Sequence, residues 1–128
     1  NWVNFSEGNA QEILAASDIG IVTSGTASLE AALLRTPVVV AYRTSWLNYC
    51  LVKPLLKIKH FALPNLLAEE VVLPELIQSE VTSFNLFEAY KDLEGNNYHK
   101  SLEAFKKMHS KLMANGPDTA AKVIAEML

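Results

Sequence analysis

Residues 23–30, Thr-Ser-Gly-Thr-Ala-Ser-Leu-Glu, are the segment of this 128-residue chain whose residue types most clearly indicate chemistry. They follow an apolar, β-branched run that is typical of a buried strand, and they open a stretch of helical character. Small and hydroxylic residues at a helix start present N–H groups and hydroxyls at the positive end of the dipole, which favours phosphate binding. A glycine there lets the backbone approach a ligand closely. The small and hydroxylic residues of this turn are Ser24, Gly25, Thr26, Ala27 and Ser28.

Such a turn can also do no more than cap its helix, and Glu30 bears on the choice. If Thr26 is the N-cap, the carboxylate of a capping box belongs at position 29, where the chain has leucine. Glu30 lies one residue later, about one turn into the helix, where its carboxylate could accept hydrogen bonds from a ribose diol. A solvated glutamate favoured by the helix dipole is the alternative.

Four further polar residues could share this site. Arg43 follows the next predicted strand, and its guanidinium could hold a phosphate at two points. Its alternative partners are a helix C-terminus or a surface carboxylate. Asn65, Glu75 and Gln78 are polar groups in apolar surroundings. If Pro74 begins a helix, Glu75 and Gln78 share one face and could both reach the same crevice; a first-turn glutamate and a helix-surface glutamine are the alternative.

The elements that must position these residues alternate between strands and helices. We expect strands near 3–5, at 19–23 and at 38–42, with a helix after Asn9 and another at 27–34. This alternation predicts an α/β fold, a doubly wound parallel sheet with crossover helices. A short strand is also expected at 61–63. The tail should be helical, with helices over 86–93 and 102–112, a break at Gly116-Pro117 and a last amphipathic helix from 120.

Composition excludes several classes of protein. The chain is 50% hydrophobic and 20% charged, as in a compact soluble domain, and we expect one domain over residues 1–128. A single cysteine cannot form an internal disulfide, which favours a reducing compartment. No apolar run approaches the ~18 residues of a membrane span, and we expect no signal peptide. The chain reads as a piece of a longer protein.

The net charge of −3 is unevenly distributed. Residues 1–30 carry four acidic and no basic residues, residues 31–68 carry five basic and no acidic residues, and residues 69–128 carry ten acidic and six basic residues. The positive middle third predicts an anionic partner. Five cations are too few to indicate a nucleic-acid partner.

Five short runs occur in a fixed order and carry a family resemblance. Together they resemble the C-terminal part of bacterial lipid-A-disaccharide synthases. A Ser-Gly-Thr turn alone is a weak signal, whereas the ordered set, over about residues 10–80, is specific. The runs are Ala-Ser-Asp at 16–18, Ser-Gly-Thr-Ala-Ser-Leu-Glu at 24–30, Pro-Val-Val-Val-Ala-Tyr-Arg at 37–43, Pro-Asn-Leu-Leu-Ala at 64–68 and Pro-Glu-Leu-Ile-Gln at 74–78.

This resemblance implies a GT-B glycosyltransferase with two Rossmann-like domains. Its donor would be UDP-2,3-diacylglucosamine, its acceptor the acylated sugar phosphate 2,3-diacylglucosamine 1-phosphate, and its products UDP and the β-1,6 disaccharide of lipid A. The full-length enzyme would be cytoplasmic and peripheral at the inner face of the inner membrane. Neither a cofactor nor a metal is expected, and the sequence offers no Asp-x-Asp pair.

By the same resemblance, this chain would bind the donor. Residues 24–28 would meet the pyrophosphate and Glu30 the ribose, and Asn65, Glu75 and Gln78 would belong to the donor site. Arg43 and the oriented amides would stabilise the leaving UDP. The acceptor-binding domain and the general base would lie outside this chain, so the chain alone should transfer nothing. Glu69-Glu70 departs from the glycine and basic residue that are common in the family at this point.

Other interpretations stay open at this stage. The chain could belong to another GT-B UDP-sugar enzyme, similar to a 2-epimerase, or be a non-catalytic α/β module that binds a protein partner. Its apolar stretch at 46–56 contains Lys53 and is followed closely by Lys57 and Lys59. This pattern resembles an interfacial helix, although a core helix with snorkelling lysines explains it as well. A homodimer through an open sheet edge is a further expectation.

Overall fold

The computed structural model describes residues 2–52 and 59–127. Its centre is a three-stranded parallel sheet in the order β1-β2-β3. The strands are β1 (Gly20–Val22), β2 (Val38–Tyr42) and β3 (Glu75–Ile77). A parallel sheet with helical connections confirms the predicted α/β class.

The middle strand, β2, is the most deeply buried. Its first four residues, Val38, Val39, Val40 and Ala41, are all buried. β-Branched residues favour the extended backbone, and a strand that is apolar on both faces needs cover on both sides. Parallel pairing on either edge of β2 places the carboxyl ends of all three strands on the same side of the molecule.

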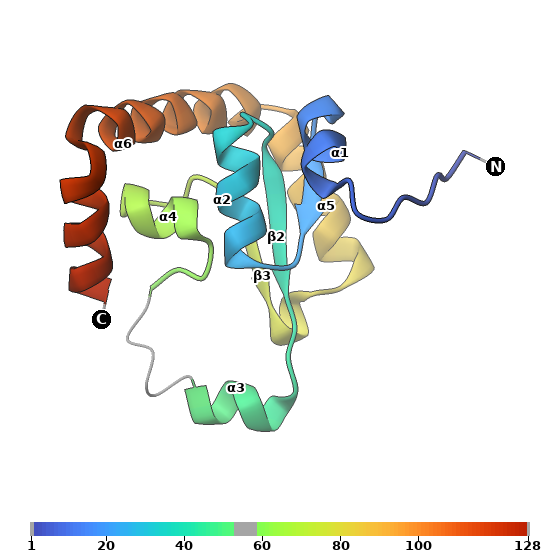
Figure 1. Ribbon diagram of the computed structural model, residues 1–128. Helices are drawn as coiled ribbons and strands as arrows, with labels where there is room; N and C mark the ends of the chain where they lie inside the picture. The colour runs from blue at the N-terminus through green and yellow to red at the C-terminus, as the bar shows by residue number, and fades with distance from the viewer. Residues whose placement is uncertain (1, 53–58, 128) are drawn as a thin grey trace.

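Six helices cover or extend this sheet within the described ranges. α2 and α4 lie on one side of the sheet and α5 on the other, while α6 passes over the end at which the strands begin (Figure 1). The helices are α1 (Ala10–Ala16), α2 (Gly25–Leu33), α3 (Trp46–Val52), α4 (Leu63–Ala68), α5 (Ser83–Glu94) and α6 (Asn97–Met127), and a 3₁₀ turn follows β3 at Gln78–Glu80. None of them has the length and apolar character that a membrane crossing requires.

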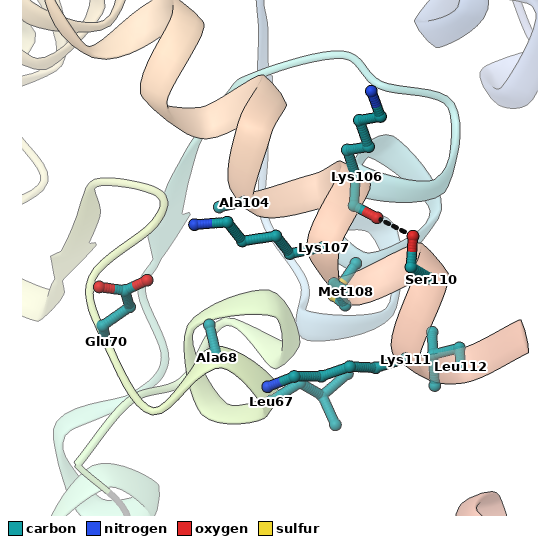
Figure 2. A pocket seen from close by; sticks show the side chains of 10 residues that line it. All are labelled: Leu67, Ala68, Glu70, Ala104, Lys106, Lys107, Met108, Ser110, Lys111 and Leu112. Carbon is teal, nitrogen blue, oxygen red and sulfur yellow. Dashed lines mark hydrogen bonds between the residues drawn. The ribbon is translucent and has the colours of Figure 1, made fainter. Parts of the chain in front are cut away.

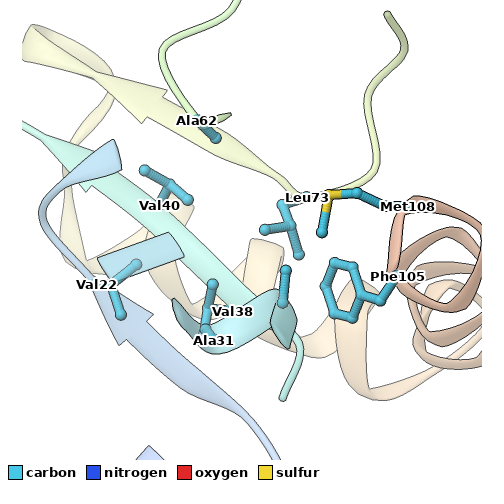
Figure 3. Packing of buried hydrophobic residues seen from close by; sticks show 9 residues of the cluster. Val22, Ala31, Val38, Val40, Ala62, Leu73, Phe105 and Met108 are labelled. Atoms are coloured by element: carbon cyan, nitrogen blue, oxygen red, sulfur yellow. The ribbon is translucent and has the colours of Figure 1, made fainter. Parts of the chain in front are cut away.

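The main hydrophobic core lies between the sheet and the side that carries α2, α4 and α6. Figure 3 shows strand side chains meeting Ala31 of α2, Leu73 of the segment before β3, and Phe105 and Met108 of α6. Phe105 is the largest fully buried side chain among the described residues. The core therefore joins the C-terminal helix to the sheet and fixes the framework on which the strand ends are mounted.

Two predicted strands do not form, and one strand was missed. Residues 2–6 are exposed and have no regular structure; residues 61 and 62 form a bend, and Leu63 is the first residue of α4. Pro74 does not begin a helix, because residues 75–77 pair with β2 as β3. Proline is compatible with the position just before a strand, and the pairing with β2 is a tertiary interaction that a local start signal does not report.

The tail is helical as expected, but its division differs. The helix predicted at 86–93 is α5, whose N-cap Thr82 accepts a hydrogen bond from the Asn85 amide. The break expected at Gly116-Pro117 does not end the helix, because α6 continues through these residues from Asn97 to Met127. Figure 1 shows α6 changing direction where its colour passes from orange to red. A proline inside a helix removes one hydrogen bond and kinks the axis without necessarily stopping the helix.

Candidate functional site

The carboxyl ends of the three strands bring the predicted site residues to one edge of the sheet. β1 leads into Ser24, β2 into Arg43 and Thr44, and β3 into Gln78. We call this edge the rim. In open α/β sheets, ligands bind outside the carboxyl ends of the strands, so the rim is the candidate site.

The helix start at the rim differs from the sequence expectation by two residues. Ser24, not Thr26, is the N-cap of α2: its backbone is extended (φ −141°, ψ 156°) and its Oγ accepts a hydrogen bond from the Ala27 N–H at 3.0 Å. The capping-box position is then Ala27, which has no carboxylate, and Glu30 lies in the second turn. Glu30 is half-buried, and its side-chain carboxylate has no hydrogen-bond partner among the residues described.

Two backbone amides are open at this helix start. In the part of the chain that the structure describes, the N–H groups of Gly25 and Thr26 have no hydrogen-bond partner. The Ala27 N–H is bonded to Ser24 Oγ, and the Ser28 N–H to the Ser24 carbonyl. Ser28 is buried, and its hydroxyl donates to the Gly25 carbonyl at 2.6 Å. The open anion-binding groups of this turn are therefore the amides of Gly25 and Thr26.

Gly25 is also required by the protein itself. A Cβ at this position would lie 3.2 Å from the carbonyl oxygen of Phe61. The segment that leads into α4 is thus packed directly against the first turn of α2, and any larger residue at position 25 would push the two apart. The absence of a side chain here serves helix packing as well as access for a ligand.

Glu75 is hydrogen-bonded to this packed segment through the amides of Phe61 and Ala62, and Asn65 is hydrogen-bonded to Glu75. The Asn65 side chain is fully buried; its Nδ2 donates to the Leu73 carbonyl and to Glu75 Oε1, and its Oδ1 accepts from the amides of Val72 and Leu73. All four hydrogen-bonding positions of the Asn65 amide are therefore occupied by the protein.

Gln78 makes a two-point contact with the loop after β2. Its Oε1 accepts from the Thr44 N–H at 2.7 Å and its Nε2 donates to the Thr44 carbonyl at 3.0 Å. The side-chain amide thus pairs with the Thr44 backbone as the backbone of an adjacent strand would, and it fixes the chain next to Arg43. Gln78 adopts a left-handed backbone conformation (φ 55°), which is unfavourable for a non-glycine residue. The structure holds Gln78 in this conformation where the chain turns away from β3.

Arg43 is exposed at the end of β2. Within residues 2–52 and 59–127 it forms neither an ion pair nor a hydrogen bond to a helix end. Neither of its expected protein partners is therefore found in that part of the chain. Arg43 directly precedes Thr44, whose backbone Gln78 holds.

A groove that the sequence did not indicate lies between α4 and α6. It has a volume of about 580 Å³, and Figure 2 shows Lys107 and Lys111 extending across it toward the α4 side, while Lys106 points away. We predicted a solvated helix face at these lysines. The groove arises because residues about forty positions apart meet in space, so no local sequence signal could reveal it.

A second hollow, of about 590 Å³, lies near the start of β1, at the opposite end of the sheet from the rim. Beside it, Glu94 accepts hydrogen bonds from Lys91 Nζ at 2.8 Å and Tyr90 Oη at 3.2 Å. The bond from Lys91 lowers the pKa of Glu94, and the bond to Glu94 raises the pKa of Tyr90. This exposed cluster stabilises α5 locally and lies away from the strand ends.

No group of three His, Cys, Asp or Glu side chains that could hold a metal ion occurs among the residues described. The donor set at the rim consists of amides, hydroxyls and one guanidinium. Groups of this kind recognise anions, and phosphates in particular.

The fold and the rim define the class: a Rossmann-like α/β unit whose strand ends carry anion-binding groups. A family model described as lipid-A-disaccharide synthetase matches residues 3–124. The chain is 41% identical over 125 residues to the lipid-A-disaccharide synthase of Dechloromonas aromatica, covering 94% of this chain and 32% of the relative. It is 37% identical over 127 residues to the synthase of Hahella chejuensis, covering 98% and 32%.

This chain belongs to the lipid-A-disaccharide synthase family, which confirms the resemblance found in the sequence. It spans about a third of the length of the curated relatives that it matches.

The close approach at Gly25 predicts the sign of a stability change. Alanine is favoured over glycine within helices by up to about 1 kcal/mol, whereas overpacking costs about 1–3 kcal/mol. At 3.2 Å from a backbone oxygen the clash should win, so we expect Gly25→Ala to lower the free energy of unfolding by about 1 kcal/mol. Gly95→Ala is the matched control, because its Cβ would meet its nearest atom at 3.4 Å. Urea unfolding measures both; a Gly25→Ala variant as stable as the wild type would contradict this packing.

Proposed function

We propose that this chain forms the donor-binding part of a glycosyltransferase that joins UDP-2,3-diacylglucosamine to 2,3-diacylglucosamine 1-phosphate. The products would be UDP and lipid A disaccharide 1-phosphate. One observation carries the proposal: the amides of Gly25 and Thr26, which have no hydrogen-bond partner among the described residues, lie on the same rim as the exposed Arg43, in a chain of the lipid-A-disaccharide synthase family. The rim offers the amides and the cation that a diphosphate requires, and the relatives, which are lipid-A-disaccharide synthases, supply the reaction class.

The chemistry of the proposed step is the departure of UDP from an oxocarbenium-like sugar. Negative charge develops on the diphosphate as the glycosidic bond breaks. Preorganised N–H groups at a helix N-terminus and a guanidinium stabilise such charge without reorganising. In this proposal the amides of Gly25 and Thr26 and the side chain of Arg43 hold the diphosphate, the Thr26 hydroxyl adds a contact, and Glu30 accepts from the ribose.

The remaining predicted donor-site residues have different tasks in this proposal. Asn65, Glu75 and Gln78 are hydrogen-bonded to the protein, so we assign them no direct contact with the diphosphate. Ser24 and Ser28 organise the helix start through their own hydrogen bonds. The general base and the acceptor site lie outside this chain, so we expect the isolated chain to bind UDP and to transfer nothing.

Membrane contact by the full-length enzyme is a further part of the proposal, and α3 is the element that we assign to it. Trp46, Leu47 and Leu51 are 75%, 69% and 64% exposed, so the alternative in which these side chains pack in the core is wrong for them. Lys59 is exposed as well, whereas Lys53 and Lys57 lie outside the described residues. Exposed Trp and Leu flanked by cations are typical of helices that lie at a lipid interface.

We infer that the enzyme is cytoplasmic and peripheral at the inner face of the inner membrane, since its acylated substrates would reside there. The homodimer suggested by the sequence stays a prediction. Among the described strands β1 is an edge strand, and its Ile21 is 54% exposed.

The assignment of Glu30 predicts a specific kinetic defect. We expect Glu30→Ala in the full-length enzyme to raise the donor KM about tenfold, because a hydrogen bond to a charged acceptor contributes about 1.5–3 kcal/mol. The acceptor KM should not change. Glu12→Ala on the exposed α1 helix is the control. Steady-state kinetics with varied donor measures both, and an unchanged donor KM in Glu30→Ala would remove the ribose role.

The assignment of α3 predicts weaker binding to vesicles. Burying one large apolar side chain is worth about 1.5–3 kcal/mol, so Trp46→Ser with Leu47→Ser should reduce partitioning of the full-length enzyme onto anionic phospholipid vesicles at least about tenfold. Phe84→Ser and Phe87→Ser on α5 form the control, since these residues are also exposed but lie on another helix. Co-sedimentation measures the partitioning. Equal losses in both pairs, or none in the α3 pair, would refute the assignment.

A further inference from the structure

Phe61 connects three parts of the rim that are distant in sequence. Its N–H donates to Glu75 Oε2 at 2.8 Å, its ring stacks on Tyr42 at the end of β2 with centroids 5.9 Å apart, and its carbonyl oxygen faces Gly25 at the start of α2. A shift of Phe61 would therefore displace the open amides of α2 relative to the end of β2.

Glu75 is the group that holds Phe61 in place. Its side chain is only 11% exposed, and its carboxylate accepts from three N–H groups: those of Phe61 and Ala62 and the Asn65 Nδ2, the last at 2.6 Å. A carboxylate is costly to bury without such partners, and hydrogen bonds to a charged acceptor are stronger than neutral ones. His60 Nδ1 lies 3.8 Å from Oε1 and completes the surroundings that the described residues provide.

Gln78 directly follows β3 and holds the loop after β2 in place. Its amide bonds both the N–H and the carbonyl of Thr44, directly beside Arg43. Glu75 and Gln78 thus hold two segments of the rim: the one at Phe61, which packs against the start of α2, and the one at Thr44, which follows Arg43.

We propose that Glu75 and Gln78 are positioning residues for donor binding: they align the amides of Gly25 and Thr26 with Arg43 and do not touch the donor themselves. This inference rests on the proposed function of the rim. The sequence predicted that Glu75 and Gln78 belong to the donor site, and we now assign them an indirect role there. The reason is that the hydrogen-bonding groups of both side chains already face the backbone of Phe61, Ala62 and Thr44.

Two isosteric substitutions that change the charge in opposite directions test this inference in the full-length enzyme. Glu75→Gln places an NH₂ group against N–H donors and removes one negative charge. Gln78→Glu places a carboxylate oxygen against the Thr44 carbonyl and adds one negative charge. Glu103→Gln and Gln11→Glu are matched controls at exposed positions. The measurements are the Kd for UDP and the KM for donor and acceptor.

Positioning predicts that both variants bind UDP more weakly, on the order of tenfold, because misaligned amides lose hydrogen bonds to the charged diphosphate. The acceptor KM and both controls should stay unchanged. A long-range charge effect on an anionic donor would instead tighten UDP binding in Glu75→Gln and weaken it in Gln78→Glu, and that result would overturn the inference. A fall in kcat with an unchanged donor KM in both variants would indicate lost folded enzyme and would overturn it too.

The wild type separates this inference from the proposed function. If wild-type enzyme binds UDP and both variants bind it equally well, the positioning role fails and the donor site stands. If wild-type enzyme does not bind millimolar UDP, the proposed function itself fails, and the inference fails with it. Should Glu75→Gln not fold, Gln78→Glu alone decides, because Gln78 is only half-buried.

Discussion

The geometry of the rim depends on the hydrogen bonds that the largely buried carboxylate of Glu75 accepts. Glu75 belongs to β3, and its side chain faces the segment that leads into α4. It has no lysine or arginine partner among the described residues; two backbone amides and the Asn65 side chain satisfy it. An unpaired carboxylate in this place would be strongly unfavourable. The backbone at Phe61 must therefore keep its N–H groups directed at β3, and this requirement carries over to Gly25 and Tyr42 through direct contact.

Local patterns predicted the elements that are determined locally. β1 and β2 are short runs of β-branched residues, and α2 begins with small and hydroxylic residues, so both periodicity and composition reported them. β3 could not be found in this way. It has only three residues, it follows a proline that also suits a helix start, and it exists because β2 offers a free edge for pairing.

The sequence predicted the location of the candidate site, but it did not predict the hydrogen-bond partners of the site residues. Asn65, Glu75 and Gln78 stood out as polar residues in apolar surroundings, and the structure brings them to the rim or beside it. A sequence does not report whether a buried polar group faces a ligand or the protein's own backbone, since both satisfy the same hydrogen-bonding need. The same holds for Gly25, whose missing side chain accommodates Phe61.

The most direct test of the account is hydrogen exchange of the full-length enzyme with and without UDP. The amides of Gly25 and Thr26 have no protein partner in the described part of the chain, so they should exchange rapidly in the free enzyme. Saturating UDP should slow exchange in a peptide covering residues 24–28, and exchange around the α4–α6 groove should not change. Unaltered exchange at 24–28 with UDP bound, or protection confined to that groove, would contradict a diphosphate site at the start of α2.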